Sequence, residues 1–182
     1  MSGSPLLKRQ SGDKAPPSKE EPREMKTLLL LRHAKTEPSS ATGTDFDRAL
    51  TERGISDATR VGEYVRAQGV TVDFIVSSSA KRAVQTGELF TKAAGLDLTV
   101  HPDRQIYEAG VNELLQFLKN MDSARDSVLL VGHNPAIENL LKLLTGNVQP
   151  MSAGTLAVLR FEGKEWSGLA AETCTLESII EP

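Results

Sequence analysis

Short apolar runs alternate with amphipathic segments along most of the chain. The runs at 27–31 and 127–131 leave almost no polar position on either face, which is typical of strands buried within a sheet. Residues 52–68 instead have apolar positions three or four apart, and this spacing predicts an amphipathic helix. Thr51 is a candidate N-cap for that helix, and Gly69 is a candidate stop.

The rest of the pattern continues the alternation. It predicts strands over 72–77 and 96–100, helices over 80–94, 112–120 and 135–144, and a terminal hairpin made by residues 154–161 and 166–173. Ser79 and Asn134 are the candidate N-caps of the helices that follow them, and Gly95 is a candidate stop. Because strands alternate with helices, we expect an α/β three-layer sandwich with a largely parallel central sheet.

Residues 1–25 have a different composition, rich in Ser, Pro, Lys and Glu. Such a segment has too little apolar surface to offset the entropy of ordering, so we expect a disordered tail. A length of 182 residues then fits a single domain over residues 26–182.

Composition narrows the function classes. The net charge of −3 argues against a nucleic-acid binder, which would present a basic face. No apolar run approaches the ~18 residues of a membrane-spanning helix, and we see no secretory signal, so we expect a cytoplasmic protein that binds no membrane. Cys174 is the only cysteine, and no spacing of metal-binding residues stands out. We therefore expect no metal or cofactor, and a monomer because nothing in the pattern indicates an interface.

Candidate chemistry follows three of the predicted strands. The first apolar run leads directly into Arg32 and His33, and the run at 127–131 leads into Gly132 and His133. Between them, Arg82 falls in the first turn of a helix, whose N-terminus favours anions. Ligands of such sheets bind beyond the carboxyl ends of the strands, so these side chains are expected in one crevice. Two imidazoles and two guanidiniums there suit a phosphoryl group.

Four motifs carry a resemblance to a known family. They read Leu30-Leu31-Arg32-His33-Ala34-Lys35, Asp45-Phe46-Asp47-Arg48-Ala49-Leu50-Thr51-Glu52-Arg53-Gly54, Ser77-Ser78-Ser79-Ala80-Lys81-Arg82-Ala83-Val84-Gln85-Thr86 and Val131-Gly132-His133-Asn134-Pro135. In this order, over residues 26–173, they resemble the histidine phosphatase superfamily and most closely its short phosphohistidine phosphatase branch. The resemblance implies a phosphoglycerate mutase-like fold.

The resemblance also implies roles for individual residues. His33 would be the nucleophile, and Arg32, Arg82 and His133 would form the phosphate pocket. Where the superfamily usually has Gly after the nucleophile, this chain has Ala34, as is common in the short branch.

Further residues are candidates for the same site. Glu108 is the nearest match to the general acid of the larger members of the superfamily. Lys35, Arg48 and Asn134 lie in the motifs and are candidate substrate contacts.

Three functions remain open from the sequence. The first is removal of phosphate from phosphohistidine in a protein such as a histidine-containing phosphotransfer domain. The second is hydrolysis of a small phosphorylated metabolite, which needs an acid because an alkoxide is a poor leaving group. The third is a non-catalytic phosphate-binding module. Only about 25 residues separate Arg82 from Glu108, which leaves little room for a lid and favours a protein substrate.

Overall fold

A computed structural model describes residues 24–182 of the chain. Its elements are the strands β1 (Met25–Arg32), β2 (Phe74–Ser78), β3 (Val100–Asp103), β4 (Ser127–Gly132), β5 (Leu156–Glu162) and β6 (Cys174–Ile180), the helices α1 (Glu52–Ala67), α2 (Lys81–Ala94), α3 (Val111–Lys119) and α4 (Ala136–Thr145), and the short 3₁₀ helices Arg104–Ile106 and Trp166–Gly168. No helix in this part of the chain is long and apolar enough to cross a membrane.

The six strands form one sheet in the order β3-β2-β4-β1-β5-β6. β3, β2, β4 and β1 run parallel to one another, whereas β5 pairs antiparallel with both β1 and β6. The expected largely parallel sheet is therefore confirmed, with β5 as the exception. The register places Arg32 of β1 beside Gly132 of β4, so the residues that follow both strands start from the same edge.

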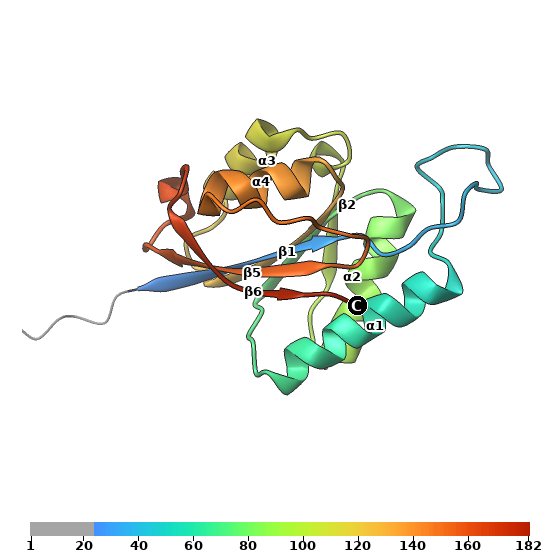
Figure 1. The fold of residues 1–182 in the computed structure, drawn as a ribbon, viewed down its shortest axis with the longest axis horizontal. Helices are drawn as coiled ribbons and strands as arrows, with labels where there is room; N and C mark the ends of the chain where they lie inside the picture. Colours follow the sequence, from blue (N-terminus) through green and yellow to red (C-terminus); the bar gives the residue numbers. More distant parts are fainter. Residues whose placement is uncertain (1–23) are drawn as a thin grey trace, which may run out of the picture.

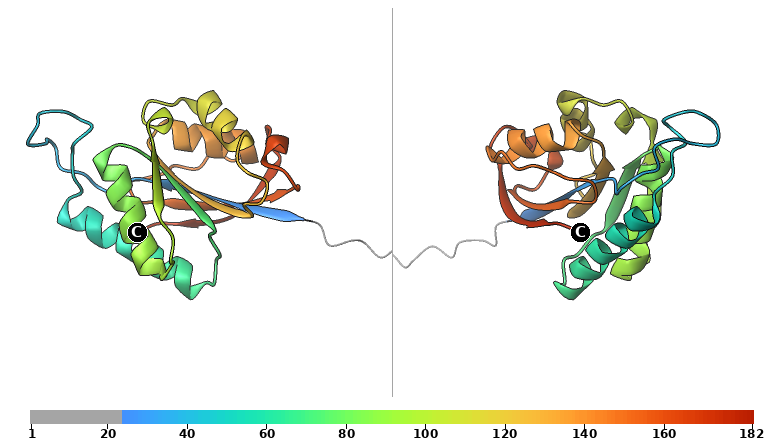
Figure 2. Two further views of the ribbon diagram at one scale, coloured as in Figure 1. Left: turned by 180° about the vertical axis from the view of Figure 1, so that it is seen from behind. Right: turned by 45° about the vertical axis from the view of Figure 1, so that its right-hand side comes forward.

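The central strand β1 carries one core on each face. Leu28 and Leu30 belong to the core beneath α3 and α4, whereas Leu29 and Leu31 belong to the core beneath α1 and α2. All four leucines are fully buried, because successive side chains of a strand point to opposite faces and both faces here are covered. Figure 1 and Figure 2 show the two helix layers on either side of the sheet, which confirms the three-layer sandwich.

Several predicted helix ends are confirmed. The Thr51 hydroxyl accepts a hydrogen bond of 3.0 Å from the amide of Gly54 and caps α1. Gly95 ends α2 with a φ of 68°, a left-handed conformation that glycine adopts without steric cost. Gly54 lies so close to the backbone of Lys35 that a Cβ at this position would be 2.1 Å from the Lys35 carbonyl oxygen. This approach holds the start of α1 against the segment that follows β1.

Two predicted caps are wrong. Ala80 is the N-cap of α2 and no side chain caps this helix, whereas the Ser79 hydroxyl is buried without a partner among the described residues. Pro135 is the N-cap of α4, and the Asn134 side chain donates to other groups.

Two predicted strands are displaced. Residues 96–100 were expected to form a strand, but β3 begins only at Val100, because Leu96 and Leu98 pack against the α1–α2 core without joining the sheet. The partner of β5 is β6 and not residues 166–173. The indole of Trp166 is fully buried in the core beneath α3 and α4 and donates to the carbonyl of Arg125, so this segment packs into that core before β6 begins.

The N-terminal boundary moves slightly. β1 starts at Met25, which the composition had assigned to the tail. The remaining residues of the predicted disordered tail, 1–23, lie outside the described part of the chain.

Candidate active site

The ends of β1 and β4 bring two histidines together. His33 follows β1 and His133 follows β4, and the amide of His33 donates to the carbonyl of Gly132 over 3.0 Å. The two imidazole ring centroids lie 5.0 Å apart with the planes tilted by 59°. The pairing of adjacent parallel strands therefore fixes the spacing of the two rings.

The two predicted arginines lie beside these rings. Arg82 is the second residue of α2 and is buried, and its positive charge is among the causes that lower the pKa of both histidines. The Thr86 hydroxyl donates to the carbonyl of Arg82 and accepts from the amide of Ala34, which ties α2 to the segment that carries His33. Arg32 donates from Nη1 to the carbonyl of Met151 over 2.8 Å.

The hydrogen bonding of His33 sets its tautomer. Nδ1 lies 2.9 Å from the carbonyl oxygen of Ala34. Because a carbonyl oxygen can only accept, Nδ1 must carry the proton and Nε2 keeps its lone pair. Burial, together with the positive charges of Arg82 and Arg32, lowers the pKa of His33 to about 4. The ring is then neutral at neutral pH, and the lone pair of Nε2 is available to a ligand.

His133 has the opposite arrangement. Its Nε2 lies 2.7 Å from the hydroxyl of Ser78, and that hydroxyl oxygen already accepts from the amide of Ala80. Within the described residues Nε2 is the one acceptor within reach of the Ser78 hydroxyl proton, so we assign Ser78 as the donor to Nε2, which leaves the proton of the neutral ring on Nδ1. Burial and the nearby charge of His33 and Arg82 lower the pKa of His133 to about 3. His133 thus offers an N–H donor from a neutral ring.

Two donors among these four residues have no partner. Nδ1 of His133 and Nε of Arg32 are both buried and make no hydrogen bond within the described residues. A buried polar group without a partner costs free energy, and such groups in folded proteins often await a ligand. An oxyanion bound among these side chains would supply the missing acceptors.

One carboxylate lies against Arg82. Arg82 donates to the backbone oxygen of Asp45 over 2.6 Å and to its carboxylate over 2.8 Å, and Arg48 donates to the second carboxylate oxygen over 2.7 Å. The hydrogen bond from Arg48, and then the charge of Arg82, hold the pKa of Asp45 below its ordinary value. The Tyr107 hydroxyl lies 3.4 Å from the same carboxylate, and the Tyr107 ring meets the His133 ring edge to face.

The remaining predicted residues lie at different distances from this centre. Arg48 reaches it through Asp45, and Asn134 donates to the carbonyl of Met151, the same group that holds Arg32. Lys35 is exposed and lines a separate cleft of about 350 Å³. Glu108 is exposed, and its carboxylate makes no interaction with the described residues. Its role as an acid stays a prediction.

Four contributors to the site had no assigned role in the sequence analysis: Ser78, Thr86, Asp45 and Tyr107. The first three fall within the quoted motifs, so the motifs could have marked them, although nothing in the spacing says what each side chain contacts. Tyr107 precedes Glu108 in the chain, and only the structure shows that the tyrosine ring contacts the ring of His133.

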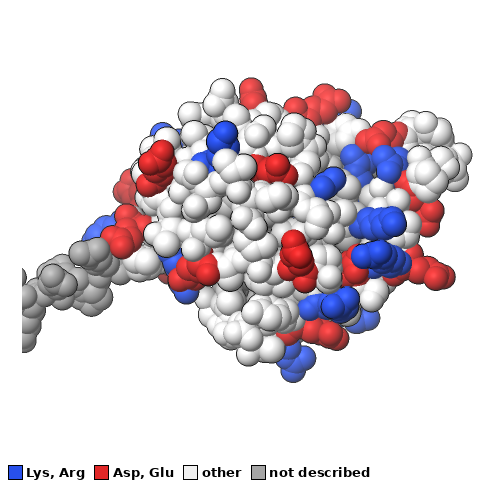
Figure 3. All heavy atoms as spheres, viewed as in Figure 1, with Lys and Arg blue, Asp and Glu red and all other residues white. Residues whose placement is uncertain are grey.

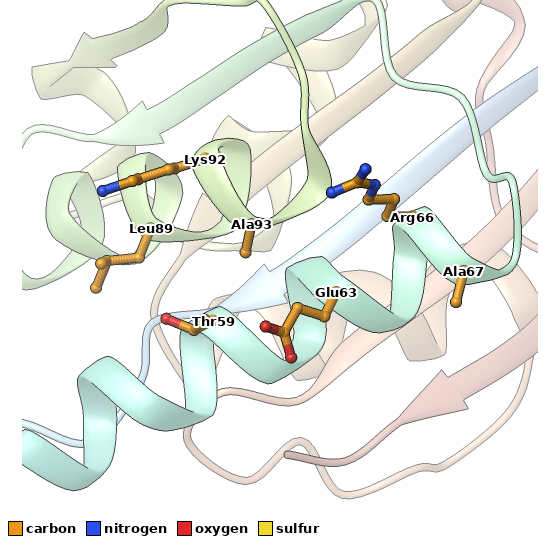
Figure 4. Close-up of a pocket in the computed structure, with 7 residues that line it drawn as sticks. All are labelled: Thr59, Glu63, Arg66, Ala67, Leu89, Lys92 and Ala93. Atoms are coloured by element: carbon orange, nitrogen blue, oxygen red, sulfur yellow. The ribbon is translucent and has the colours of Figure 1, made fainter.

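Neither a metal centre nor a second catalytic cluster stands out in the described residues. Residues 24–182 contain no group of three His, Cys, Asp or Glu side chains that could hold a metal ion. A cleft of about 620 Å³ lies between α1 and α2 and is lined by Thr59, Glu63, Arg66, Ala67, Leu89, Lys92 and Ala93 (Figure 4). Its charges are mixed and it holds no histidine, so the centre around His33 remains the candidate active site.

Comparisons with known proteins agree with this geometry. A model of the histidine phosphatase superfamily (branch 1) matches residues 28–117. A solved structure from Nakamurella multipartitia, provisionally described as phosphohistidine phosphatase SixA, is 30% identical with a TM-score of 0.78, and the match covers 89% of this chain and 99% of that one. A structure from Agrobacterium tumefaciens with the same provisional description is 27% identical with a TM-score of 0.72, over 86% of this chain and 98% of that one.

An uncharacterized protein of Mycobacterium leprae is 26% identical over 167 residues, which are 84% of this chain and 99% of the relative. The chain belongs to the histidine phosphatase superfamily and has its phosphoglycerate mutase-like fold.

The depressed histidine pKa values predict an unusual titration. We expect the imidazoles of His33 and His133 to stay neutral as pH falls through 6.5, and to take up protons only near the values of about 4 and about 3. The unfolded chain binds these protons near 6.5, so the free energy of unfolding should fall as pH drops from 6.5 towards 4. An NMR titration of the imidazole resonances in ligand-free protein measures this directly, and a midpoint near 6.5 for either ring would contradict the assignment.

Ser78 and Ser79 form a matched pair for testing the tautomer of His133. Ser78→Ala removes the hydroxyl that donates to Nε2, so we expect about 1–3 kcal/mol less stability and weaker binding of inorganic phosphate. Ser79→Ala removes a buried hydroxyl that has no partner, so stability should stay the same or rise. Thermal unfolding and phosphate titration of both variants provide the comparison. Equal effects of the two substitutions would show that Ser78 does not hold the ring.

Proposed function

We propose that the protein is a phosphatase that forms a covalent phosphohistidine at Nε2 of His33, and that its substrate is phosphohistidine in another protein. The geometry that carries the proposal is the pair of adjacent imidazoles, whose hydrogen-bond partners lead us to assign opposite tautomers. His33 presents a lone pair, and His133 presents an N–H 5.0 Å away between ring centroids, with Arg32 and Arg82 supplying positive charge. These are the parts that phosphoryl transfer needs, namely a nucleophile and donors for the developing charge.

The first step transfers the phosphoryl group. The Nε2 lone pair of His33 forms a bond to phosphorus while the bond to the leaving imidazole nitrogen of the substrate breaks. Arg32, Arg82 and Nδ1–H of His133 donate to the phosphoryl oxygens. A substrate imidazole that carries a proton on its other nitrogen leaves as a neutral molecule, so the exchange between two imidazoles needs no further proton.

The second step returns the enzyme to its starting state. Water attacks phosphorus, the P–Nε2 bond breaks, and His33 regains its lone pair while phosphate leaves as the monoanion. The carbonyl of Ala34 keeps the proton of His33 on Nδ1 throughout. The protein therefore supplies position and charge in both steps.

Two observations support a protein substrate. The carboxylate of Glu108 makes no contact with the pocket, and a phosphohistidine substrate does not require such an acid. The relatives from Nakamurella multipartitia and Agrobacterium tumefaciens carry the provisional description phosphohistidine phosphatase. Figure 3 shows Lys and Arg interspersed with Asp and Glu on the right-hand side of this face, so the surface there carries charges of both signs.

His33→Ala tests the nucleophile. We expect wild-type protein to release phosphate from a phosphorylated histidine-containing phosphotransfer domain and from an aryl phosphate, and the variant to lose more than about 10³-fold of both rates. His101→Ala is the matched control, because His101 is exposed and stacks on Phe74 away from the pocket. Activity retained in His33→Ala would show that His33 is not the nucleophile. Turnover of a sugar phosphate without any turnover of phosphohistidine would show that the substrate is not phosphohistidine in a protein.

A further inference from the structure

The loop between β1 and α1 carries a carboxylate into the site. This loop projects beyond the sheet in Figure 1 and returns with Asp45 against Arg82. The ion pair joins an exposed carboxylate to a guanidinium that is almost completely buried, at 2.8 Å. Arg48, three residues further on, holds the second oxygen of the same carboxylate at 2.7 Å. The chain therefore directs one acidic side chain to the group that binds phosphoryl oxygens.

Asp45 and a bound phosphoryl group must share Arg82. Both terminal nitrogens of the guanidinium already donate to Asp45, one to its backbone oxygen and one to its carboxylate. A phosphoryl group held by the remaining N–H groups would lie next to that carboxylate. By contrast, Glu108 is exposed and contacts none of the pocket residues. Of these two carboxylates, Asp45 is thus the one in contact with the arginine that would hold the phosphoryl group.

We propose that Asp45 is the proton donor of this site and extends its activity to phosphate monoesters. The inference rests on the proposed function, because it requires the same attack by His33. When Nε2 of His33 attacks a monoester, the P–O bond breaks and the proton of the Asp45 carboxylic acid passes to the leaving oxygen, which departs as an alcohol or phenol. Water then attacks the phosphohistidine and gives one proton back to Asp45, so hydrogen phosphate leaves and the enzyme is restored.

We expect substrate binding to favour the protonated form of Asp45. In the ligand-free site, Arg48 and Arg82 favour the charged carboxylate. A phosphoryl group takes over part of Arg82 and brings its own negative charge close to Asp45. Both changes favour the protonated carboxylic acid. The Tyr107 hydroxyl, 3.4 Å from the carboxylate, helps to hold the acid in place.

The leaving group distinguishes a proton donor from a structural residue. We expect Asp45→Asn to lower the rate of His33 phosphorylation by phenyl phosphate by at least about 10²-fold, since the phenolate then leaves without a proton. The rate with a phosphohistidine protein should fall much less, because that leaving group brings its own proton. Asp45→Glu should restore part of the phenyl phosphate rate. Single-turnover rapid quench with full-length protein measures all of these rates.

Asp47→Asn is the control, because Asp47 lies on the same loop and accepts from Thr42 and Thr44 instead of from Arg82. It should leave the ratio of the two rates unchanged. An equal change with both substrates in Asp45→Asn, or a leaving-group dependence seen in Glu108→Gln instead, would overturn the role of Asp45. A wild-type protein that never forms phosphohistidine with any donor would overturn the proposed function itself, which is a separate result.

Discussion

The site depends on the in-register parallel pairing of β1 with β4. This pairing runs from Thr27 beside Ser127 to Arg32 beside Gly132, and it continues in the hydrogen bond from the amide of His33 to Gly132. Both strands are buried on both faces, and a shift of one residue would move each side chain of the shifted strand to the opposite core and would separate His33 from Gly132. The same burial that stabilises the sheet therefore sets the distance between the two imidazoles.

Burial also decides the chemistry of these rings. In water, an imidazole beside guanidinium groups could still take up protons near neutral pH, whereas desolvation keeps both rings neutral here. Their different hydrogen-bond partners, a carbonyl for His33 and a hydroxyl for His133, then give them opposite tautomers. One ring can attack and the other can donate, although the two side chains are of the same type. Asp45, which is ion-paired with Arg82, adds the proton donor that we propose for phosphate monoesters.

The sequence predicted the sandwich and the meeting of His33, Arg32, Arg82 and His133, because wholly apolar runs indicate buried strands and ligands of such sheets bind beyond the carboxyl ends of the strands. It misplaced β3 and β6. Leu96 and Leu98 are apolar because they pack against the core beneath α1 and α2, and Trp166 is apolar because it fills the core beneath α3 and α4, but neither segment joins the sheet. It did not show the contact of Asp45 with Arg82, because 37 residues separate them and the loop between carries no periodic pattern. Local contacts such as the hydroxyl of Ser78 on His133 likewise depend on the folded chain.

The most direct test of the account is the position of the phosphoryl group on His33. Rapid quench with a phosphodonor, followed by ³¹P and ¹⁵N NMR of the trapped protein, distinguishes the two ring nitrogens. Because Nδ1 donates to the carbonyl of Ala34, the account predicts phosphorylation at Nε2 alone. Phosphate on Nδ1, or on a residue other than His33, would contradict it.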